Sequence, residues 1–361
     1  MRKRVRPTEH SDGENVSSSF RMQKKTTVCQ EKKGLASKFW FWVKSGAFAL
    51  CAIFIMMPIL EELPEIIRQR VYYHRIRAPF VFDLSHPAEL ELNHTINMYL
   101  EPEEGISLGI WHTVPDDKWK EAQGKDSAWY HRSLKDGSPV IIYLHGRTQT
   151  RAAKHRIGVV NVLSSIGCHV LSMDYRGFGD STGKPTEEVL TKDAVWLHRW
   201  AKENSGGSRV LIWGHSLGSG VATNTAVRLM EQGVLVDAVI LEGSFKNVQM
   251  YWPQNPFDRY SSKIKRLILR DEVANDVIFP NDENVKKMRS PLLFLHSEDD
   301  HLTTLRNAEQ MYQAALSVQG DKRVRMVTFE GFLGYLHMGL YKDPRLPAII
   351  KNFVVTTEEM S

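Results

Sequence analysis

The segment RVLIWGHSLGSG, residues 209–220, decides the fold class of this 361-residue chain. Four apolar residues lead into a Gly-x-Ser-x-Gly pattern centred on Ser216, and a helical pattern then continues to about Met230. A buried strand, a tight turn and a helix in this order form a nucleophile elbow, in which strained backbone exposes the serine hydroxyl. The structural alternative is a glycine-rich helix start capped by Ser216. The first interpretation predicts an α/β protein with Ser216 as its nucleophile.

Short apolar runs recur on both sides of this segment, separated by stretches of helical length. They are Val140–Leu144, Val170–Met173, Val210–Trp213, Val236–Leu241 and Leu292–Leu295. Runs that are apolar on both faces are typical of a parallel sheet covered by helices on each side. Upstream, Ile96–Leu100 and Ile106–Val114 flank the turn sequence EPEEG and predict an antiparallel hairpin. We therefore expect a mostly parallel central sheet with helices on both faces and an N-terminal antiparallel hairpin.

A serine hydroxyl needs a histidine base at neutral pH, and the base needs a carboxylate that fixes its tautomer. The chain order Ser, acid, His of this arrangement leaves three of the 14 histidines, those that follow Ser216. His296 ends a strand-like run ahead of the acidic residues. His301 adjoins an aspartate, which is too close for acid and base to lie on separate loops. His337 is therefore the predicted base.

The acid is expected in the segment HSEDD, residues 296–300, directly after the predicted strand Leu292–Leu295. Open α/β sheets build their sites at the carboxyl ends of strands. Asp299 and Asp300 compete for the role; the spacing after the strand favours Asp300, and Glu298 is a third candidate. Each of them has the alternative of being an exposed loop charge.

An oxyanion hole needs two backbone N–H donors aimed at the developing charge. The amide of Leu217, the residue after the nucleophile, is one predicted donor. The run Val140–Leu144 leads into His145-Gly146-Arg147, and a His-Gly step there resembles the oxyanion loop of esterases. The amide of Arg147 is the second predicted donor.

The N-terminal part of the chain differs in composition from the rest. Residues 1–38 hold ten Lys/Arg against four Asp/Glu without apolar periodicity, which predicts a disordered basic tail. Residues 39–60 are strongly apolar and would form about 33 Å of helix, enough to cross a bilayer core of about 30 Å. We expect a transmembrane signal anchor there, in preference to a cleaved signal peptide or a core helix. A juxtamembrane linker, 61–90, and a catalytic domain, 91–361, would follow.

Several classes of function are excluded. The net charge of +5 resides in the tail, because the remaining residues hold 37 Lys/Arg against 38 Asp/Glu, so no basic footprint for nucleic acid remains. Three cysteines, Cys29, Cys51 and Cys168, form no CxxC pair, and no P-loop, HExxH or EF-hand pattern occurs. The glycines of residues 177–183 lack the third position of a dinucleotide fingerprint, since residue 182 is threonine. We therefore expect no cofactor and no metal.

With these residues in place, the chain resembles the membrane-anchored lysophosphatidylserine and monoacylglycerol lipases of the α/β-hydrolase domain-containing series, the twelfth member and its B paralogue. The resemblance spans roughly residues 78–355 and is carried by WHTVP (111–115), GKD (124–126), DYRGFGDS (174–181), WGHSLG (213–218), NDENVK (281–286) and GYLHMGLYK (334–342). It implies an α/β-hydrolase fold, acyl ester cleavage through a serine acyl-enzyme, no metal, and an endoplasmic reticulum membrane location with the catalytic domain on the lumenal side.

The predicted function is hydrolysis of an acyl ester of a single-chain lipid at the bilayer surface, by Ser216, Asp300 and His337. Arg147, Arg151 and Arg156, just beyond the oxyanion loop, are expected to contact an anionic phospho-head group. The aromatic-rich segment 245–278 is expected to form a lid, with an ordinary packed insertion as the alternative.

Two other functions remain open. The same triad would serve a thioesterase acting on palmitoylated protein, and a catalytically silent interaction protein could retain the fold. The sequon at Asn93 favours a lumenal domain, where it would be glycosylated. The sequence leaves the oligomeric state, acyl-chain length and head group undetermined.

Overall fold

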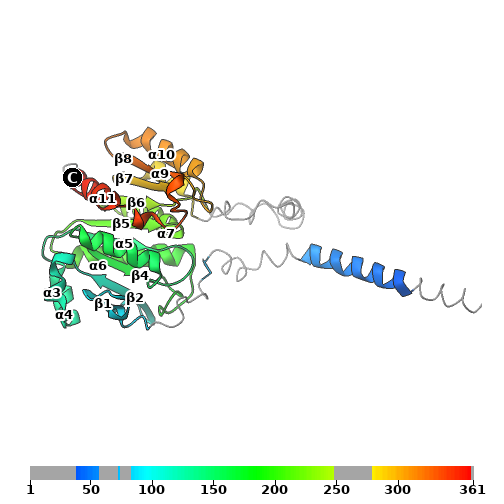
Figure 1. Ribbon diagram of the computed structural model, residues 1–361, viewed down its shortest axis with the longest axis horizontal. Helices are drawn as coiled ribbons and strands as arrows, with labels where there is room; N and C mark the ends of the chain where they lie inside the picture. Colours follow the sequence, from blue (N-terminus) through cyan, green and yellow to red (C-terminus); the bar gives the residue numbers. More distant parts are fainter. Residues whose placement is uncertain (1–37, 57–71, 74–82, 248–278, 359–361) are drawn as a thin grey trace, which may run out of the picture. The chain divides into compact units, whose positions relative to one another are not determined.

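The computed structural model describes residues 38–56, 72–73, 83–247 and 279–358 (Figure 1). The predicted tail before Lys38, the end of the predicted anchor and most of the predicted lid lie outside these residues. The chain divides into two units, Met1–Leu63 and Pro64–Ser361. The first contains the 19-residue helix Lys38–Met56, which is long and apolar enough to cross a membrane. Large apolar side chains such as Trp40, Trp42 and Phe48 are exposed on it, as an apolar surrounding would require.

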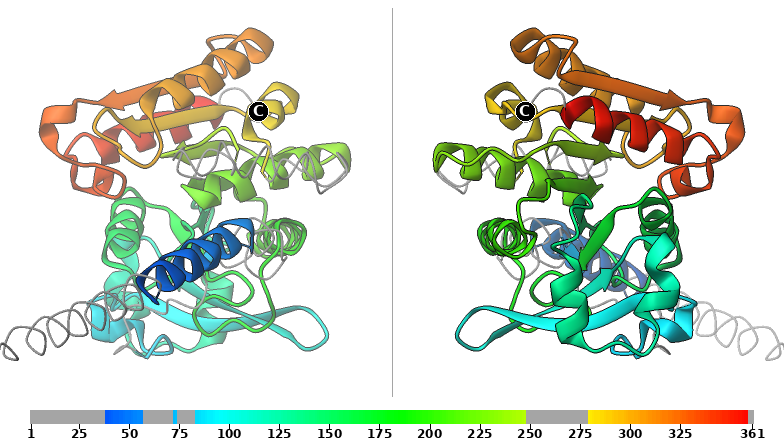
Figure 2. Two further views of the ribbon diagram at one scale, coloured as in Figure 1. Left: turned by 90° about the vertical axis from the view of Figure 1, so that its right-hand side faces the viewer. Right: turned by 90° about the vertical axis from the view of Figure 1, so that its left-hand side faces the viewer.

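The second unit is built on an eight-stranded sheet with the order β1-β2-β4-β3-β5-β6-β7-β8. The strands are β1 Thr95–Glu103, β2 Ile106–Thr113, β3 Val140–Leu144, β4 His169–Met173, β5 Val210–His215, β6 Val239–Glu242, β7 Leu292–Ser297 and β8 Val324–Phe329. The pairs β1–β2 and β2–β4 are antiparallel, and all the other neighbours are parallel. The hairpin β1–β2 forms one edge of the sheet and β8 the other (Figure 2).

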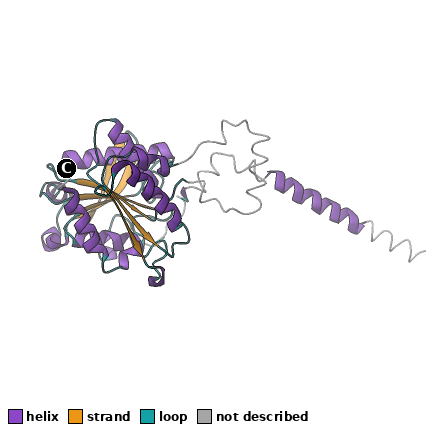
Figure 3. Ribbon diagram, turned by 90° about the horizontal axis from the view of Figure 1, so that it is seen from above, coloured by secondary structure: helices purple, strands orange, loops and turns teal. Residues whose placement is uncertain are grey.

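Helices enclose the sheet on both sides (Figure 3). They are α3 Trp119–Ala122, α4 Ser127–Ser133, α5 Lys154–Ser165, α6 Glu187–Asn204, α7 Leu217–Glu231, α9 Asn281–Lys287, α10 Leu305–Gln319 and α11 Leu346–Glu358. Short 3-10 turns are η1 Pro87–Leu90, η2 Asp116–Lys118, η4 Gly331–Leu333 and η5 Leu340–Lys342. Helices α5 and α11 contact each other over one face of the sheet. Helices α6, α7, α9 and α10 cover the other face, where each contacts the next.

Strand β3 illustrates why the apolar runs form central strands. Val140, Ile142 and Leu144 belong to the core under α6, α7 and α10, whereas Ile141 and Tyr143 belong to the core under α5 and α11. All five side chains are buried. Burying both faces stabilises the strand by about 25 cal/mol for each Å² of apolar surface removed from water, which explains the continuous apolar pattern.

The predicted fold class and the N-terminal hairpin are confirmed, and each predicted run overlaps a strand. One strand, β8, has no counterpart among the predicted runs. It is an edge strand whose sequence VRMVTF has only its first and last side chains buried, so it lacks a continuous apolar signature. Within the predicted linker, 61–90, Tyr72 packs into the main core of the second unit.

Acid is expected to unfold the protein through its buried histidines. Burial lowers the pKa of His198 in α6 and of His169 in β4 to about 4, whereas an unfolded chain binds a proton near pH 6.5. Below pH 6.5 the unfolded state therefore binds more protons than the folded state. The stability that comes from keeping these histidines neutral is fully present above pH 6.5 and falls as the pH drops toward 4. Each such histidine lowers the free energy of unfolding by up to about 1.4 kcal/mol per pH unit in that window.

Urea unfolding of the detergent-solubilised protein at pH 7.5 and pH 5.5 measures this loss. His198→Leu removes one of the titrating groups. The free energy of unfolding should then depend less steeply on pH, by the equivalent of up to one bound proton. Identical pH dependence in the variant and the parent protein would contradict a neutral, buried His198.

Candidate active site

Ser216 occupies the sharp turn between β5, which ends at His215, and α7, which begins at Leu217. Its φ of 53° and ψ of −118° lie in a strained region for a residue with a side chain. Two glycines make the turn possible. A methyl group at Gly214 would lie 2.3 Å from the Gly218 carbonyl oxygen, and one at Gly218 would lie 1.9 Å from the Leu144 carbonyl oxygen. Glycine is needed at both positions because backbone approaches backbone there.

His337 and Asp300 form a buried pair. The imidazole Nδ1 lies 2.7 Å from Asp300 Oδ2. Oδ1 of the same carboxylate accepts the amides of Leu302 and Thr303, each at 2.9 Å, and Oδ2 also accepts the Thr303 hydroxyl at 2.7 Å. Burial alone would raise the pKa of Asp300, but the hydrogen bonds from His337 and Thr303 and the neighbouring charge hold it well below its usual range. Asp300 is therefore an anion that orients the ring.

Asp299 has a different neighbourhood from Asp300. Its Oδ1 accepts the Ser297 hydroxyl at 2.5 Å and the Leu336 amide at 2.9 Å. It therefore braces the backbone beside His337. Of the two aspartates that competed in the sequence, Asp300 is the one in contact with the imidazole.

The carboxyl ends of three neighbouring strands bring this pair to the elbow. The Ser216 amide donates to the Glu242 carbonyl at the end of β6, with 3.0 Å between N and O. His215 Nε2 lies 2.9 Å from the His337 carbonyl oxygen, and the two rings are 4.9 Å apart. A methyl group at Gly243 would lie 3.1 Å from His337 Cε1. His337 thus lies against His215, the last residue of β5, and against Gly243, the residue that follows β6.

The loop after β3 passes beside Ser216. A methyl group at Gly146 would lie 3.3 Å from Ser216 Cβ and from His215 Nδ1. The peptide between Gly146 and Arg147 is therefore next to the nucleophile, as is the first amide of α7, at Leu217. The Arg147 side chain is half-buried, with its guanidinium 4.8 Å from the Tyr73 ring.

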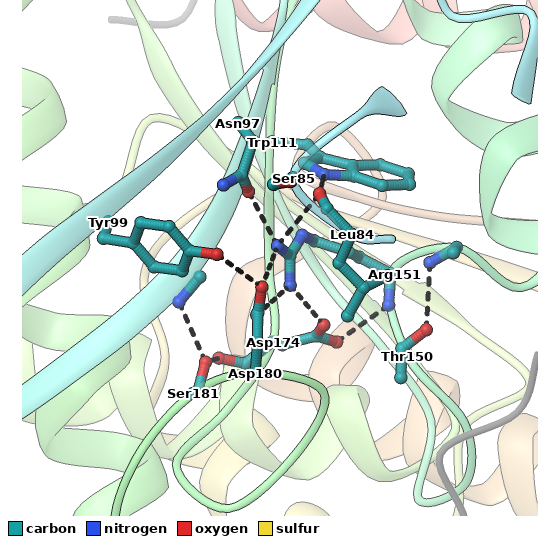
Figure 4. A network of polar contacts seen from close by, with 12 residues as sticks. Leu84, Ser85, Asn97, Tyr99, Trp111, Thr150, Arg151, Asp174, Asp180 and Ser181 are labelled. Carbon is teal, nitrogen blue, oxygen red and sulfur yellow. Dashed lines mark hydrogen bonds and ion pairs between the residues drawn. The ribbon is translucent and has the colours of Figure 1, made fainter. Parts of the chain in front are cut away.

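Arg151 does not serve the role predicted for it. Its buried guanidinium forms ion pairs with Asp174 and Asp180, both at 2.6 Å, and donates to Asn97 Oδ1 at 2.7 Å (Figure 4). These partners lie on β1 and on the loop after β4, so Arg151 links the edge strand β1 to that loop. Turning the guanidinium toward a ligand would leave two carboxylates uncompensated, one of them fully buried. The prediction that Arg151 contacts a head group is wrong.

Arg156 is also buried, and the head-group prediction is wrong for it too. Nη1 donates to the Thr150 carbonyl at 2.6 Å, and Nη2 donates to the carbonyls of Gly146, at 3.3 Å, and Thr148. All three acceptors belong to the loop that follows β3. Arg156 therefore contacts the predicted oxyanion loop from inside the protein.

Sequence reasoning did not find the supports of the site, Thr303 and Asp174. Thr303 donates its amide and hydroxyl to Asp300; the Asp-x-x-Thr spacing is a side-chain capping pattern that could have indicated this contact. Asp174 accepts the Arg151 amide at 2.8 Å and lies 3.1 Å from His145 Nε2. In the part of the chain that the structure describes, no group of three or more His, Cys, Asp or Glu residues is arranged to hold a metal ion.

Comparison with known proteins agrees with this architecture. A family model for the alpha/beta hydrolase fold matches residues 139–266. An α/β hydrolase from Vibrio vulnificus has a similar fold, with a TM-score of 0.58 and 17% identity over 82% of this chain and 94% of that one. Est1E from Butyrivibrio proteoclasticus gives a TM-score of 0.52 and 17% identity over 73% of this chain and 99% of its own.

Two curated relatives are much closer in sequence. Lysophosphatidylserine lipase ABHD12 of Danio rerio is 43% identical over 312 residues, 84% of this chain and 81% of its own length. Protein ABHD12B of Homo sapiens is 46% identical over 304 residues, 83% of this chain and 81% of its own. These identities extend over most of both chains. The protein therefore belongs to the ABHD12 family of α/β hydrolases.

Proposed function

We propose that this protein is a membrane-anchored serine hydrolase that cleaves the acyl ester of a single-chain lipid, lysophosphatidylserine or monoacylglycerol. The observation that carries the proposal is the buried His337–Asp300 pair, 2.7 Å from Nδ1 to Oδ2, held against the elbow that contains Ser216. The substrate class is suggested by relatives that are themselves named lysophosphatidylserine lipases.

The roles follow from this geometry. Asp300 binds Nδ1 of His337, so Nε2 is the nitrogen left to take the proton from the Ser216 hydroxyl. The serine oxygen attacks the ester carbonyl, and the tetrahedral intermediate collapses to an acyl-enzyme as His337 returns the proton to the departing glycerol oxygen. Water, deprotonated by the same imidazole, then releases the fatty acid. The amides of Leu217 and Arg147 stabilise the oxyanion in both steps.

The substrate class is tested with purified protein and three acyl donors of equal chain length: lysophosphatidylserine, monoacylglycerol and an acyl-cysteine peptide. We expect the oxygen esters to be hydrolysed with the higher kcat/KM. Preference for the thioester would favour a protein depalmitoylase. Absence of labelling of Ser216 by a fluorophosphonate, together with no hydrolysis, would indicate a silent interaction protein.

Arg147 remains a candidate for head-group binding, because its side chain is half-buried at the edge of the site rather than enclosed. Arg147→Met keeps the backbone amide and removes the cation. We expect kcat/KM for lysophosphatidylserine to fall about tenfold, the value of one charge-assisted hydrogen bond, with monoacylglycerol hydrolysis nearly unchanged. Equal losses on both substrates would contradict a head-group contact.

For location, the proposal is a single-pass anchor at residues 39–60 in the endoplasmic reticulum membrane, with the catalytic unit lumenal. Asn93 is exposed in a turn just before β1, where a glycan has room. Glycosidase treatment should shift the mobility of the expressed protein but not of Asn93→Gln. An unglycosylated Asn93 would favour the cytosolic side.

A further inference from the structure

The peptide group between Gly146 and Arg147 has two functional sides. Its N–H is the proposed second oxyanion donor, and its C=O belongs to Gly146, the residue packed against Ser216. Because a trans peptide is planar, C=O and N–H point in opposite directions. Whatever fixes the direction of the Gly146 carbonyl therefore also fixes the direction of the catalytic N–H.

Two buried side chains bind that carbonyl. Arg156 Nη2 donates to it at 3.3 Å, and His145 Nδ1 lies 2.7 Å from it. Arg156, in the first turn of α5, also donates to the carbonyls of Thr148 and Thr150. Alternate carbonyls of one loop thus converge on a single guanidinium, which sets the orientation of the whole loop.

Arg156 also differs electrostatically from its neighbour Arg151. Arg151 is ion-paired with two carboxylates, whereas the hydrogen bonds of Arg156 within the described residues go to main-chain carbonyls. A guanidinium behind the carbonyl polarises the peptide so that its N–H carries more positive charge. In a buried site of low dielectric this effect is strong.

We propose that Arg156 is a positioning residue for the oxyanion hole: it aims and polarises the 146–147 peptide from behind. The proposal rests on the assignment of the Arg147 amide as an oxyanion donor. It explains why a cationic side chain with several donors in one plane is buried under this loop, where one ammonium group could not reach three carbonyls in the same geometry.

Arg156→Met tests the proposal, because methionine fills similar space without a donor or a charge. Deletion of a complete oxyanion donor costs about 10²–10³ in kcat, so misdirecting one should lower kcat about 10- to 100-fold and change KM less than about threefold. Arg156→Lys, which keeps the charge but not the fork, should fall between Arg156→Met and the parent protein.

Arg209→Met is the matched control. Arg209 likewise donates to a main-chain carbonyl, that of Val354, and to the Thr357 hydroxyl. It lies at the opposite end of β5 from Ser216, roughly 20 Å away at the strand rise of about 3.3 Å per residue. Its loss should lower the melting temperature while kcat stays within about twofold.

A second measurement separates positioning from general damage. The Ser216 oxygen forms a bond to the carbonyl carbon of a long-chain trifluoromethyl ketone while His337 takes the hydroxyl proton, and the former carbonyl oxygen becomes an anion in the oxyanion hole. Its inhibition constant should rise in proportion to the loss of kcat/KM across Arg156→Lys and Arg156→Met. If Arg156→Met does not fold, the lysine variant alone decides by the same proportionality.

Unchanged kcat in a folded Arg156 variant, or a loss of kcat without weaker inhibitor binding, would overturn the positioning role. Failure of the proposed function has a different signature, since the parent protein itself would then prefer the acyl-cysteine peptide or hydrolyse none of the three acyl donors. Loss of activity in Ser216→Ala together with full activity in Arg156→Met would reject only the inference about Arg156.

Discussion

Ser216→Ala should lower kcat for lipid ester hydrolysis by at least about 10³-fold and leave the melting temperature nearly unchanged. The chemical step has no other nucleophile in the proposed mechanism, and removal of a catalytic serine leaves only binding and oxyanion stabilisation. Alanine retains the β-carbon that packs against Gly146. The strained backbone at this position is set by the glycines around it, so the fold should tolerate the change.

Ser219→Ala is the matched control for Ser216→Ala. Ser219 belongs to the same turn, and its buried hydroxyl donates to the Ser216 carbonyl at 2.7 Å. Its loss removes this hydrogen bond and the longer one, at 3.4 Å, that the hydroxyl accepts from Asn281 Nδ2. Each is worth about 1 kcal/mol of stability, and no reacting atom is lost. Initial rates with saturating substrate and fluorophosphonate labelling measure both variants. Residual activity of Ser216→Ala within tenfold of the parent protein would reject Ser216 as the nucleophile.

The architecture was predictable because the central strands are buried on both faces. Val140–Leu144 and Val210–Trp213 must be apolar throughout to serve two cores, and such runs stand out in a sequence. The elbow was predictable for a different reason, since backbone crowding at Gly214 and Gly218 leaves few residue types possible. Edge strand β8 was not predicted because its half-exposed residues need not be apolar.

The surroundings of the site were harder to predict. Arg151 and Arg156 follow the oxyanion loop closely in the sequence. This closeness does not reveal in which direction either side chain points. Whether a guanidinium faces substrate or protein depends on partners far along the chain, and the carboxylates that bind Arg151 lie 23 and 29 residues away. The acceptors that bind Arg156 are main-chain carbonyls, which every residue has, so no residue type in the sequence indicates them. Burial of charge is decided by tertiary contacts, which local patterns do not encode.

The choice between adjacent aspartates had the same limit. Asp299 and Asp300 are equivalent in composition and almost equivalent in position, yet Asp300 binds the His337 ring and Asp299 binds the Leu336 amide. The direction of each side chain after β7 depends on the turn that Thr303 closes. The two residues therefore provide a matched pair of isosteric variants.

Asp300→Asn should lower kcat about 10²- to 10⁴-fold, whereas Asp299→Asn should lower it less than about fivefold. In Asp300→Asn the amide oxygen will occupy the Oδ1 position, which accepts the Leu302 and Thr303 amides at 2.9 Å. The NH2 group then replaces Oδ2, 2.7 Å from His337 Nδ1. A donor at that point selects the tautomer protonated at Nε2, which cannot accept the serine proton.

Asp299→Asn keeps an oxygen for the Ser297 hydroxyl and the Leu336 amide, so the loop carrying His337 should hold its place. Initial rates measured for both variants at pH 7.5, with melting temperatures to verify folding, distinguish the two roles. Equal losses in the two variants would mean that the aspartates act on the loop rather than on the imidazole. A large loss in Asp299→Asn alone would assign the role of triad acid to Asp299. Only a residue that sets the charge and tautomer of His337 can affect proton transfer this strongly without unfolding the protein.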